Sequence, residues 1–221
     1  MKLSNETIDV LKSFAAINMS LLIKSGNTIK TVSPQKTILG TASVPDSFPK
    51  ECAIYDLNEF LSVVQSMKDP DLEFKDKYVN ISEETGGNVN YQYASPSTIA
   101  SPPDKDIKLP SEDVSVEIPQ EVFSNAIRMA SIMKLSELAI RASKGTATIE
   151  ALEAKNPERC YSYPIGKSDD NYMVLFKVEN MKLLPRDYSV RVSSKGISEF
   201  KSKTGDVVYY IPTEVGTSIG K

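Results

Sequence analysis

The chain carries the same run of elements twice, and this repeat constrains its fold more than any other feature. The spacing of apolar residues predicts an amphipathic helix at residues 4–18 and another at 119–133, about 114 positions later. A strand that leads directly into a second helix is predicted at 52–67. A similar step, from strand 173–176 into a short helix at 178–184, follows about 121 positions later. A chain of 221 residues that repeats one unit predicts two similar domains.

The segment between the two copies differs in composition from both. Around residues 95–112 the chain is rich in proline and has no hydrophobic period, which is typical of an extended connector. The sequence therefore predicts an N-terminal domain at 1–94, a connector at 95–112 and a C-terminal domain at 113–221. The tail, 213–221, is predicted to be mobile.

Short strands with turn signals between them follow the first helix of each copy. One such signal is Ser25-Gly26-Asn27, and proline or glycine separates several of the later strands. Two helices laid on one face of an antiparallel sheet give an α+β layer architecture. We therefore expect an α+β fold with two helices in each domain.

Composition excludes several classes of function. The chain has no histidine, which removes Ser-His and Cys-His nucleophile pairs and the commonest metal ligand. No paired-carboxylate pattern stands out, so no catalytic residue, metal or cofactor is predicted. The net charge is −3, made up of −3 in residues 1–94, −1 in the connector and +1 in residues 113–221. Any contact with nucleic acid must therefore come from a local arrangement of charge rather than from a basic protein surface.

Two cysteines and the absence of long apolar runs indicate the cellular location of the protein. Cys52 and Cys160 sit in apolar strand patterns and are predicted to be small core residues rather than a disulfide, which indicates an intracellular setting. No apolar run approaches the ~20 residues that span a bilayer, and residues 1–4 lead directly into a helix without a signal-peptide core. No membrane partner is expected.

Several blocks of residues resemble the sliding clamp, or DNA polymerase processivity factor, of T-even-type tailed phages. They lie in the same order along nearly the whole chain. The blocks are Met1-Lys-Leu-Ser4 with Leu11-Lys12, Phe14-Ala15, Ile17-Asn18 and Lys24-Ser25-Gly26; Ala53-Ile-Tyr-Asp-Leu-Asn58 with Phe60-Leu61; Pro96-Ser97-Thr98; and Asn180-Met181-Lys182 before Pro185 and Tyr188.

The resemblance implies a DNA-clamp fold that assembles as a homotrimeric ring of six domains. Helices would line the hole and sheets would form the outer wall. Duplex DNA would thread the hole without sequence-specific binding, while the replicative DNA polymerase would hold the outside. The resemblance further implies loading by an ATP-driven clamp loader, a role as a mobile platform for late-transcription factors, no catalytic activity, and the cytoplasm of the infected host cell.

On this resemblance the polar faces of the helices point at DNA. A sliding ring needs cationic side chains near phosphates but no contacts with base edges. The alternative is that these cations are solvated residues on ordinary outer helix faces. We expect weak, salt-sensitive DNA contact from five residues: Lys12, Lys68, Arg128, Lys134 and Lys182.

Two further surfaces follow from the resemblance. In clamps a short partner peptide docks in an apolar pocket under the connector, for which the sequence offers Ile99, Ile107, Leu109, Tyr210 and Pro212. The strand at the end of the first domain would pair with strand 159–166 of a neighbouring subunit, with Tyr91, Tyr93, Tyr161 and Tyr163 along these edges. Alternatively, the apolar residues pin the connector or complete the core, and the tyrosines cover each sheet within one chain.

Three rival functions remain at this stage. A non-catalytic two-domain scaffold or virion structural protein would share the repeat but would not encircle DNA. An enzyme that uses carboxylates or lysine is disfavoured by the missing histidine and the lack of clustered acids. A sequence-reading transcription factor would need a basic recognition helix after a tight turn, and the sequence predicts none.

Overall fold

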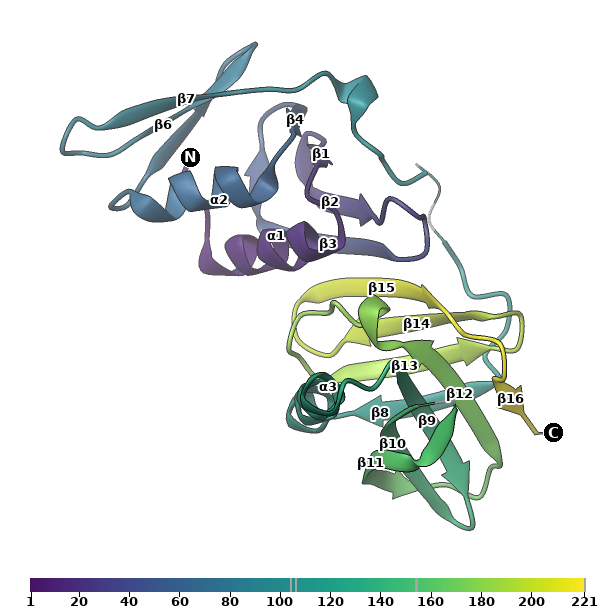
Figure 1. The fold of residues 1–221 in the computed structure, drawn as a ribbon. Helices are drawn as coiled ribbons and strands as arrows, with labels where there is room; N and C mark the ends of the chain where they lie inside the picture. The colour runs from purple at the N-terminus through teal and green to yellow at the C-terminus, as the bar shows by residue number, and fades with distance from the viewer. Residues whose placement is uncertain (104, 106, 154, 221) are drawn as a thin grey trace. The chain divides into compact units, whose positions relative to one another are not determined.

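The chain folds into two compact units. The computed structural model describes residues 1–103, 105, 107–153 and 155–220 (Figure 1). The first unit contains Met1–Lys105 with Gly205–Val207, and the second contains Asp106–Thr204 with Val208–Lys221. The chain passes from one unit to the other inside the segment predicted as the connector.

The first unit is built from two helices, seven short strands and a 3-10 turn among its described residues. In chain order the elements are α1 (Asn5–Ile17), β1 (Leu21–Ile23), β2 (Gly26–Val32), β3 (Leu39–Phe48), β4 (Cys52–Ile54), α2 (Leu57–Ser66), β5 (Asp71–Phe74), β6 (Tyr78–Ser82), β7 (Asn88–Gln92) and η1 (Pro96–Thr98).

The second unit has one α-helix, a 3-10 turn and nine strands in the part that the structure describes. Its elements are β8 (Val114–Ile118), α3 (Gln120–Met133), β9 (Glu137–Ser143), β10 (Thr146–Glu153), β11 (Asn156–Lys167), β12 (Tyr172–Lys177), η2 (Val178–Asn180), β13 (Tyr188–Ser193), β14 (Ile197–Ser202), β15 (Asp206–Pro212) and β16 (Ser218–Ile219).

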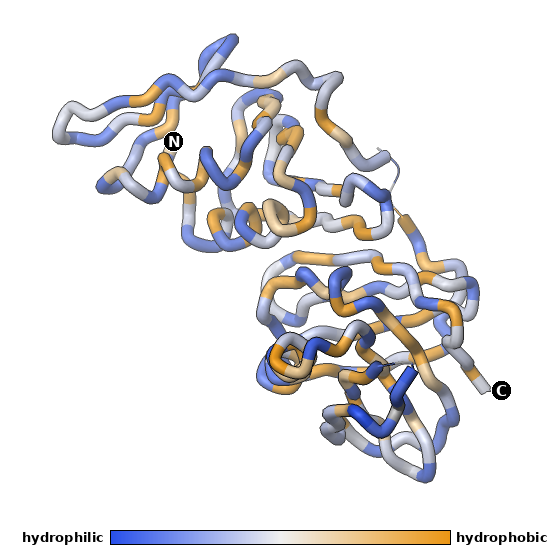
Figure 2. Tube along the Cα trace, viewed as in Figure 1, coloured by the Kyte–Doolittle hydropathy of each residue, from blue (hydrophilic) through white to orange (hydrophobic). Residues whose placement is uncertain are grey.

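Both helices of the first unit begin at a capping side chain. The Ser4 hydroxyl accepts a hydrogen bond from the Thr7 N–H at 3.2 Å. The Asp56 carboxylate accepts from the N–H groups of Asn58 and Glu59, both at 3.0 Å. These bonds satisfy N–H groups that have no partner inside a helix. Polar and apolar positions alternate around each helix in Figure 2, so each helix has one apolar face to bury.

The strands of the first unit pair antiparallel in small groups. β2 pairs with β3 and β1 pairs with β4, while β5, β6 and β7 form a three-stranded sheet in that order. The helices pack on each other, and α1 also packs on β2 and β3. The Phe60 ring of α2 meets the Tyr91 ring of β7 edge to face at 5.4 Å. The core therefore ties the second helix to the last strand of the unit.

In the second unit, α3 packs on a large antiparallel sheet. The strand order of that sheet is β11, β10, β9, β12 and β16, and α3 contacts β9, β10 and β11. β8 pairs with β13, β13 with β14, and β14 with β15, all antiparallel. An aromatic cluster surrounds the fully buried Tyr188 of β13, whose ring meets those of Phe123 of α3, Phe200 of β14 and Tyr209 of β15 edge to face.

The prediction of a helix at 178–184 is wrong. The structure has a 3-10 turn of three residues there, so the second unit lacks the counterpart of α2. The N–H of Leu184 donates to the Tyr209 hydroxyl at 3.3 Å, and its carbonyl accepts from the Tyr188 hydroxyl at 2.6 Å. The Tyr209 hydroxyl thus replaces the acceptor that a helix would have supplied for the Leu184 N–H, and the Tyr188 hydroxyl satisfies the Leu184 carbonyl. Pro185 also disfavours the helical conformation for the residue before it.

Two smaller predictions are also wrong. The tail, predicted to be mobile, instead contains the short strand β16, which pairs with β12 through Tyr172 and Ile219, and the Glu214 N–H donates to the Leu175 carbonyl at 2.8 Å. Cys52 is buried as predicted, and burial raises the pKa of its thiol to about 12. Cys160 is exposed, because it lies on β11, which has a strand neighbour on one side only.

Removing the Asp56 cap tests this account of the first unit. An Asp56→Ala variant is expected to lower the free energy of unfolding of the unit by about 1 kcal/mol, because two N–H groups at the start of α2 lose their acceptor. Thermal unfolding followed by circular dichroism measures the change. Asn58→Ala, an exposed position on the same helix, is the matched control. Equal midpoints for the two variants would contradict the capping role.

Candidate functional site

The two candidate cations of the first unit lie in locally acidic surroundings. Lys12 is exposed on α1, where its turn also exposes Asp9. Lys68 is exposed just after α2, and its main-chain N–H donates to the Glu83 carboxylate at 3.0 Å. The exposed residues of α2 itself include Glu59 and no lysine or arginine. Any attraction between this unit and phosphates is therefore weak.

The three candidate cations of the second unit are also exposed. On α3 the Arg128 guanidinium donates to the side-chain oxygen of Asn125 at 3.0 Å. Lys134 ends α3 in the left-handed conformation, and its N–H bonds to the carbonyls of Ala130 and Ser131, so it has a structural role as well. Lys182 follows η2. The structure thus places all five predicted cations where solvent reaches them, and their contact with DNA stays a prediction.

Two of the sheets, the three-stranded one in the first unit and the five-stranded one in the second, each end in a strand that has a neighbour on one side only within the described residues. β7 is the last strand of the three-stranded sheet, and β11 is the first strand of the larger sheet in the second unit. The far edge of the first sheet is different, because Leu72 of β5 exchanges main-chain hydrogen bonds with Met1. The far side of β12 is covered by the tail strand β16. β7 and β11 are therefore the open edges of these two sheets.

The four tyrosines predicted at these edges differ in their surroundings. Tyr91 is buried inside its own unit: its hydroxyl donates to the Asp56 carbonyl at 2.9 Å, and burial raises its pKa to about 12. Tyr93 follows β7, and its hydroxyl is buried without a hydrogen-bond partner among the described residues, which raises its pKa. Tyr161 is half-buried, whereas Tyr163 is 46% exposed.

Tyr163 belongs to the core face of its sheet and is nevertheless open to solvent. It lies directly opposite Ile149, and Tyr161 lies opposite Ala151, both of which are fully buried. Because β11 is the edge strand, the apolar face continues to the edge of the sheet without a cover. An apolar side chain next to unpaired main-chain groups is typical of a surface that pairs with another chain.

Sequence reasoning missed two residues next to this edge. Ile132 on α3 is 65% exposed although it is apolar, and α3 packs on β11. Arg159 of β11 donates to the Met133 carbonyl at 2.5 Å, which ties the end of the helix to the strand. The helical period puts Ile132 off the buried stripe of α3, and that signal was present in the sequence.

Four of the five residues predicted for the partner pocket lie in the second unit. Ile107, Leu109, Tyr210 and Pro212 are half-buried there, and the Tyr210 hydroxyl is 2.9 Å from the Ile107 carbonyl oxygen. Ile99 lies in the first unit and is buried. The structure therefore brings the connector residue and the β15 residue together, and their contact with a partner peptide stays a prediction.

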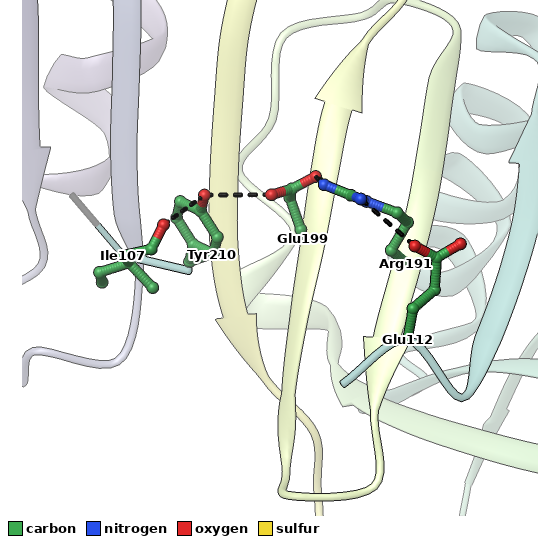
Figure 3. A network of polar contacts seen from close by, with 5 residues as sticks. All are labelled: Ile107, Glu112, Arg191, Glu199 and Tyr210. Atoms are coloured by element: carbon green, nitrogen blue, oxygen red, sulfur yellow. Dashed lines mark hydrogen bonds and ion pairs between the residues drawn. The ribbon is translucent and has the colours of Figure 1, made fainter. Parts of the chain in front are cut away.

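A polar network that the sequence analysis did not identify extends from this contact (Figure 3). The Tyr210 hydroxyl is 3.0 Å from one oxygen of Glu199, and the other oxygen of Glu199 binds Arg191. Arg191 in turn reaches the Glu112 carboxylate at 3.2 Å. The hairpin turn near Lys195 puts Arg191 opposite Glu199, so this pair could have been found from the register of the hairpin.

The described residues contain no group of three or more histidine, cysteine, aspartate or glutamate side chains placed to hold a metal ion. Among the helices that the structure describes, none is long and apolar enough to cross a membrane.

Comparison with known proteins decides the family. A family model described as DNA polymerase processivity factor matches residues 4–101. The sliding clamp of Vibrio phage KVP40 is 30% identical over 222 residues, which cover 97% of this chain and 99% of that protein. The chain belongs to the sliding-clamp family. The sliding clamp of Enterobacteria phage T4 is similar to it as well, at 28% identity over 96% of this chain and 95% of the relative.

Solved structures show that the clamp fold extends beyond phages. The proliferating cell nuclear antigen (PCNA) of Entamoeba histolytica matches this clamp with a TM-score of 0.71 at 13% identity, over 95% of each chain. The PCNA of A. fulgidus, solved with the C-terminal region of FEN-1 bound, matches with a TM-score of 0.69 at 14% identity, over 94% of each chain. The α+β clamp fold expected from the sequence is thereby confirmed.

The charge of the helix faces leads to a prediction about DNA contact. The clamp is expected to bind linear duplex DNA weakly, and Arg128→Ala is expected to reduce the salt slope by about 0.9 for each phosphate that the guanidinium no longer neutralises. Fluorescence anisotropy at about 50 to 200 mM salt gives the slope. Lys203→Ala, which removes a cation paired with Glu117 in the same unit, is the control. A salt-independent affinity would contradict the prediction.

Proposed function

We propose that three copies of this clamp form a ring that encircles duplex DNA without reading its sequence and tethers the replicative DNA polymerase during processive synthesis. The observation that carries the proposal is the 30% identity to a sliding clamp along 97% of the chain. The proposed setting is the cytoplasm of the phage's host cell, where the DNA is copied.

The two open sheet edges support the assembly. In the proposed joint, β7 of one subunit pairs with β11 of the next, so both rows of unpaired main-chain groups find partners. The exposed side chains of Tyr163 and Ile132 would be buried at the same joint. A head-to-tail contact between different surfaces closes into a ring when the rotation between subunits divides a full turn.

The sparse cations support sliding rather than tight binding. A ring held in place by its topology needs no strong attraction to phosphates, and contacts with base edges would stop its movement. No metal-binding cluster occurs among the described residues, and the role proposed here requires no catalysis by the clamp.

The proposed partners follow from the same role. A ring must be opened to admit DNA, so we include an ATP-driven clamp loader among the partners. Late-transcription factors are a further proposed user of the moving ring. A. fulgidus PCNA was solved with a partner's C-terminal region bound, and we propose similar docking of an extended partner peptide beside Ile107, Leu109, Tyr210 and Pro212.

Topological retention on DNA separates this function from a scaffold or virion protein. The clamp, loaded with its cognate loader and ATP, is expected to stay on nicked circular DNA during gel filtration and to leave when the circle is cut. Light scattering is expected to give about three times the chain mass of 24.3 kDa. Equal retention on circular and linear DNA, or a monomer at every concentration, would contradict the ring.

A single charge at the open edge of β11 tests the joint. Tyr163→Glu is expected to convert the trimer to monomers while each unit stays folded, because a carboxylate would have to be buried without a partner. Light scattering reports the mass and circular dichroism reports the fold. Val215→Glu, at a fully exposed apolar residue outside both edge strands, is the control. A trimer that survives Tyr163→Glu would rule out this joint.

A further inference from the structure

A row of three polar side chains crosses one face of the sheet in the second unit (Figure 3). Arg191, Glu199 and Tyr210 occupy directly opposite positions on β13, β14 and β15. Arg191 binds only one carboxylate oxygen of Glu199, Oε1, with its Nε at 3.0 Å and its Nη2 at 2.5 Å. The Tyr210 hydroxyl lies 3.0 Å from the other oxygen, Oε2. Glu199 is 6% exposed, so its carboxylate is largely shielded from water, whereas the Arg191 side chain is partly exposed.

The two ends of the row hold the connector at two points. At one end Arg191 Nη1 is 3.2 Å from Glu112 Oε2, and the neighbouring Ser111 hydroxyl is 2.7 Å from that of Ser193. At the other end the Tyr210 hydroxyl is 2.9 Å from the carbonyl oxygen of Ile107. The first attachment is an ion pair with added hydrogen bonds, whereas the second depends on a single hydroxyl group.

That hydroxyl has two acceptors but only one proton. A tyrosine O–H can donate one hydrogen bond, and both the Ile107 carbonyl and Glu199 Oε2 are acceptors within hydrogen-bonding distance. A charged carboxylate is the stronger acceptor of the two. The proton is therefore shared unevenly, and the connector is held less firmly at Ile107 than the distance alone suggests.

We propose that this row is a latch that sets how firmly residues 107–112 of the connector are ordered on the sheet of the second unit, and thereby how tightly a partner peptide binds beside them. The inference rests on the peptide docking proposed above and specifies its control. Ile107, Leu109, Tyr210 and Pro212 are half-buried, so the connector forms one wall of a surface that is still partly open. Ordering that wall before binding lowers the entropy cost of docking.

The geometry predicts opposite effects for two nearly isosteric variants. In Glu199→Gln the amide oxygen can replace Oε1 toward Arg191, and the amide N–H₂ can replace Oε2 and donate to the Tyr210 oxygen. The hydroxyl proton is then free to bond the Ile107 carbonyl, so the latch tightens. Tyr210→Phe removes the hydroxyl and opens the latch. If Glu199 and Tyr210 only stabilised the sheet, both substitutions would change the order of the connector in the same direction.

Limited trypsin digestion of the full-length clamp measures the order of the connector directly. Lys108 is exposed one residue beyond Ile107, so the rate of cleavage after it reports local opening. We expect cleavage severalfold slower in Glu199→Gln and severalfold faster in Tyr210→Phe than in the unsubstituted clamp. Glu117→Gln, which removes the same charge at an exposed site on β8, should not change the rate. Equal rates, or changes in the same direction, would overturn the latch.

Binding to the replicative polymerase encoded by the same phage tests whether the latch affects the docking of a partner. Surface plasmon resonance should show severalfold weaker binding for Tyr210→Phe and equal or tighter binding for Glu199→Gln. If the order of the connector changes as expected and the affinities do not, the link between latch and docking is wrong. If the polymerase does not bind the unsubstituted clamp, the proposed function fails, and the trypsin rates still decide whether the latch exists.

Discussion

Main-chain N–H and C=O groups at the edge of a sheet need partners, and the way this chain meets that need determines the rest of its structure. Met1 covers the edge at β5, and the tail strand β16 covers the side of β12. In these two sheets the opposite edges, at β7 and β11, are left open. A chain with one open edge at each of two different surfaces is suited to head-to-tail assembly, in which every copy gives one edge and receives another.

The electrostatics of the helices fit a protein that holds its ligand by enclosure. The first unit exposes as many acidic as basic groups around α1 and α2, and the second adds isolated cations at Arg128, Lys134 and Lys182. Such a distribution gives little affinity for a polyanion and little resistance to movement along it. In the proposed ring, retention on DNA would then depend on the joints between subunits rather than on contacts with phosphate.

The sequence predicted the elements well wherever local signals were strong. The repeat and the spacing of apolar residues placed α1, α2 and α3 within a few residues of their observed bounds. It failed where distant groups decide the local conformation. Residues 178–184 have helical spacing, but the hydroxyls of Tyr188 and Tyr209 bind the main chain of Leu184, and no local pattern reveals this.

At the candidate surfaces, too, local sequence patterns predicted some features, whereas others depend on the packing of residues distant in the sequence. The exposure of Lys12 and Arg128 followed from helical periodicity, whereas Lys68, Lys134 and Lys182 lie at or beyond the ends of helical elements. Tyr91 and Tyr163 have the same residue type and were assigned the same role, yet one is buried against Phe60 and the other is open. Which side of an edge strand is covered depends on the packing of the whole unit. The row from Arg191 to Tyr210 required the pairing of three strands and therefore became visible only in the structure.

The hydrogen bonds at Leu184 also affect whether substitutions could give the second half of the chain a helix like α2. To rebuild a helix like α2 in the second half, the N–H of Leu184 would have to leave the buried Tyr209 hydroxyl. Replacing Tyr209 by phenylalanine would leave that N–H without its acceptor, and replacing Tyr188 would leave the Leu184 carbonyl without its donor, each at a cost of about 1–3 kcal/mol. Single substitutions therefore lead through less stable intermediates, and the asymmetry between the two copies is protected against gradual reversal.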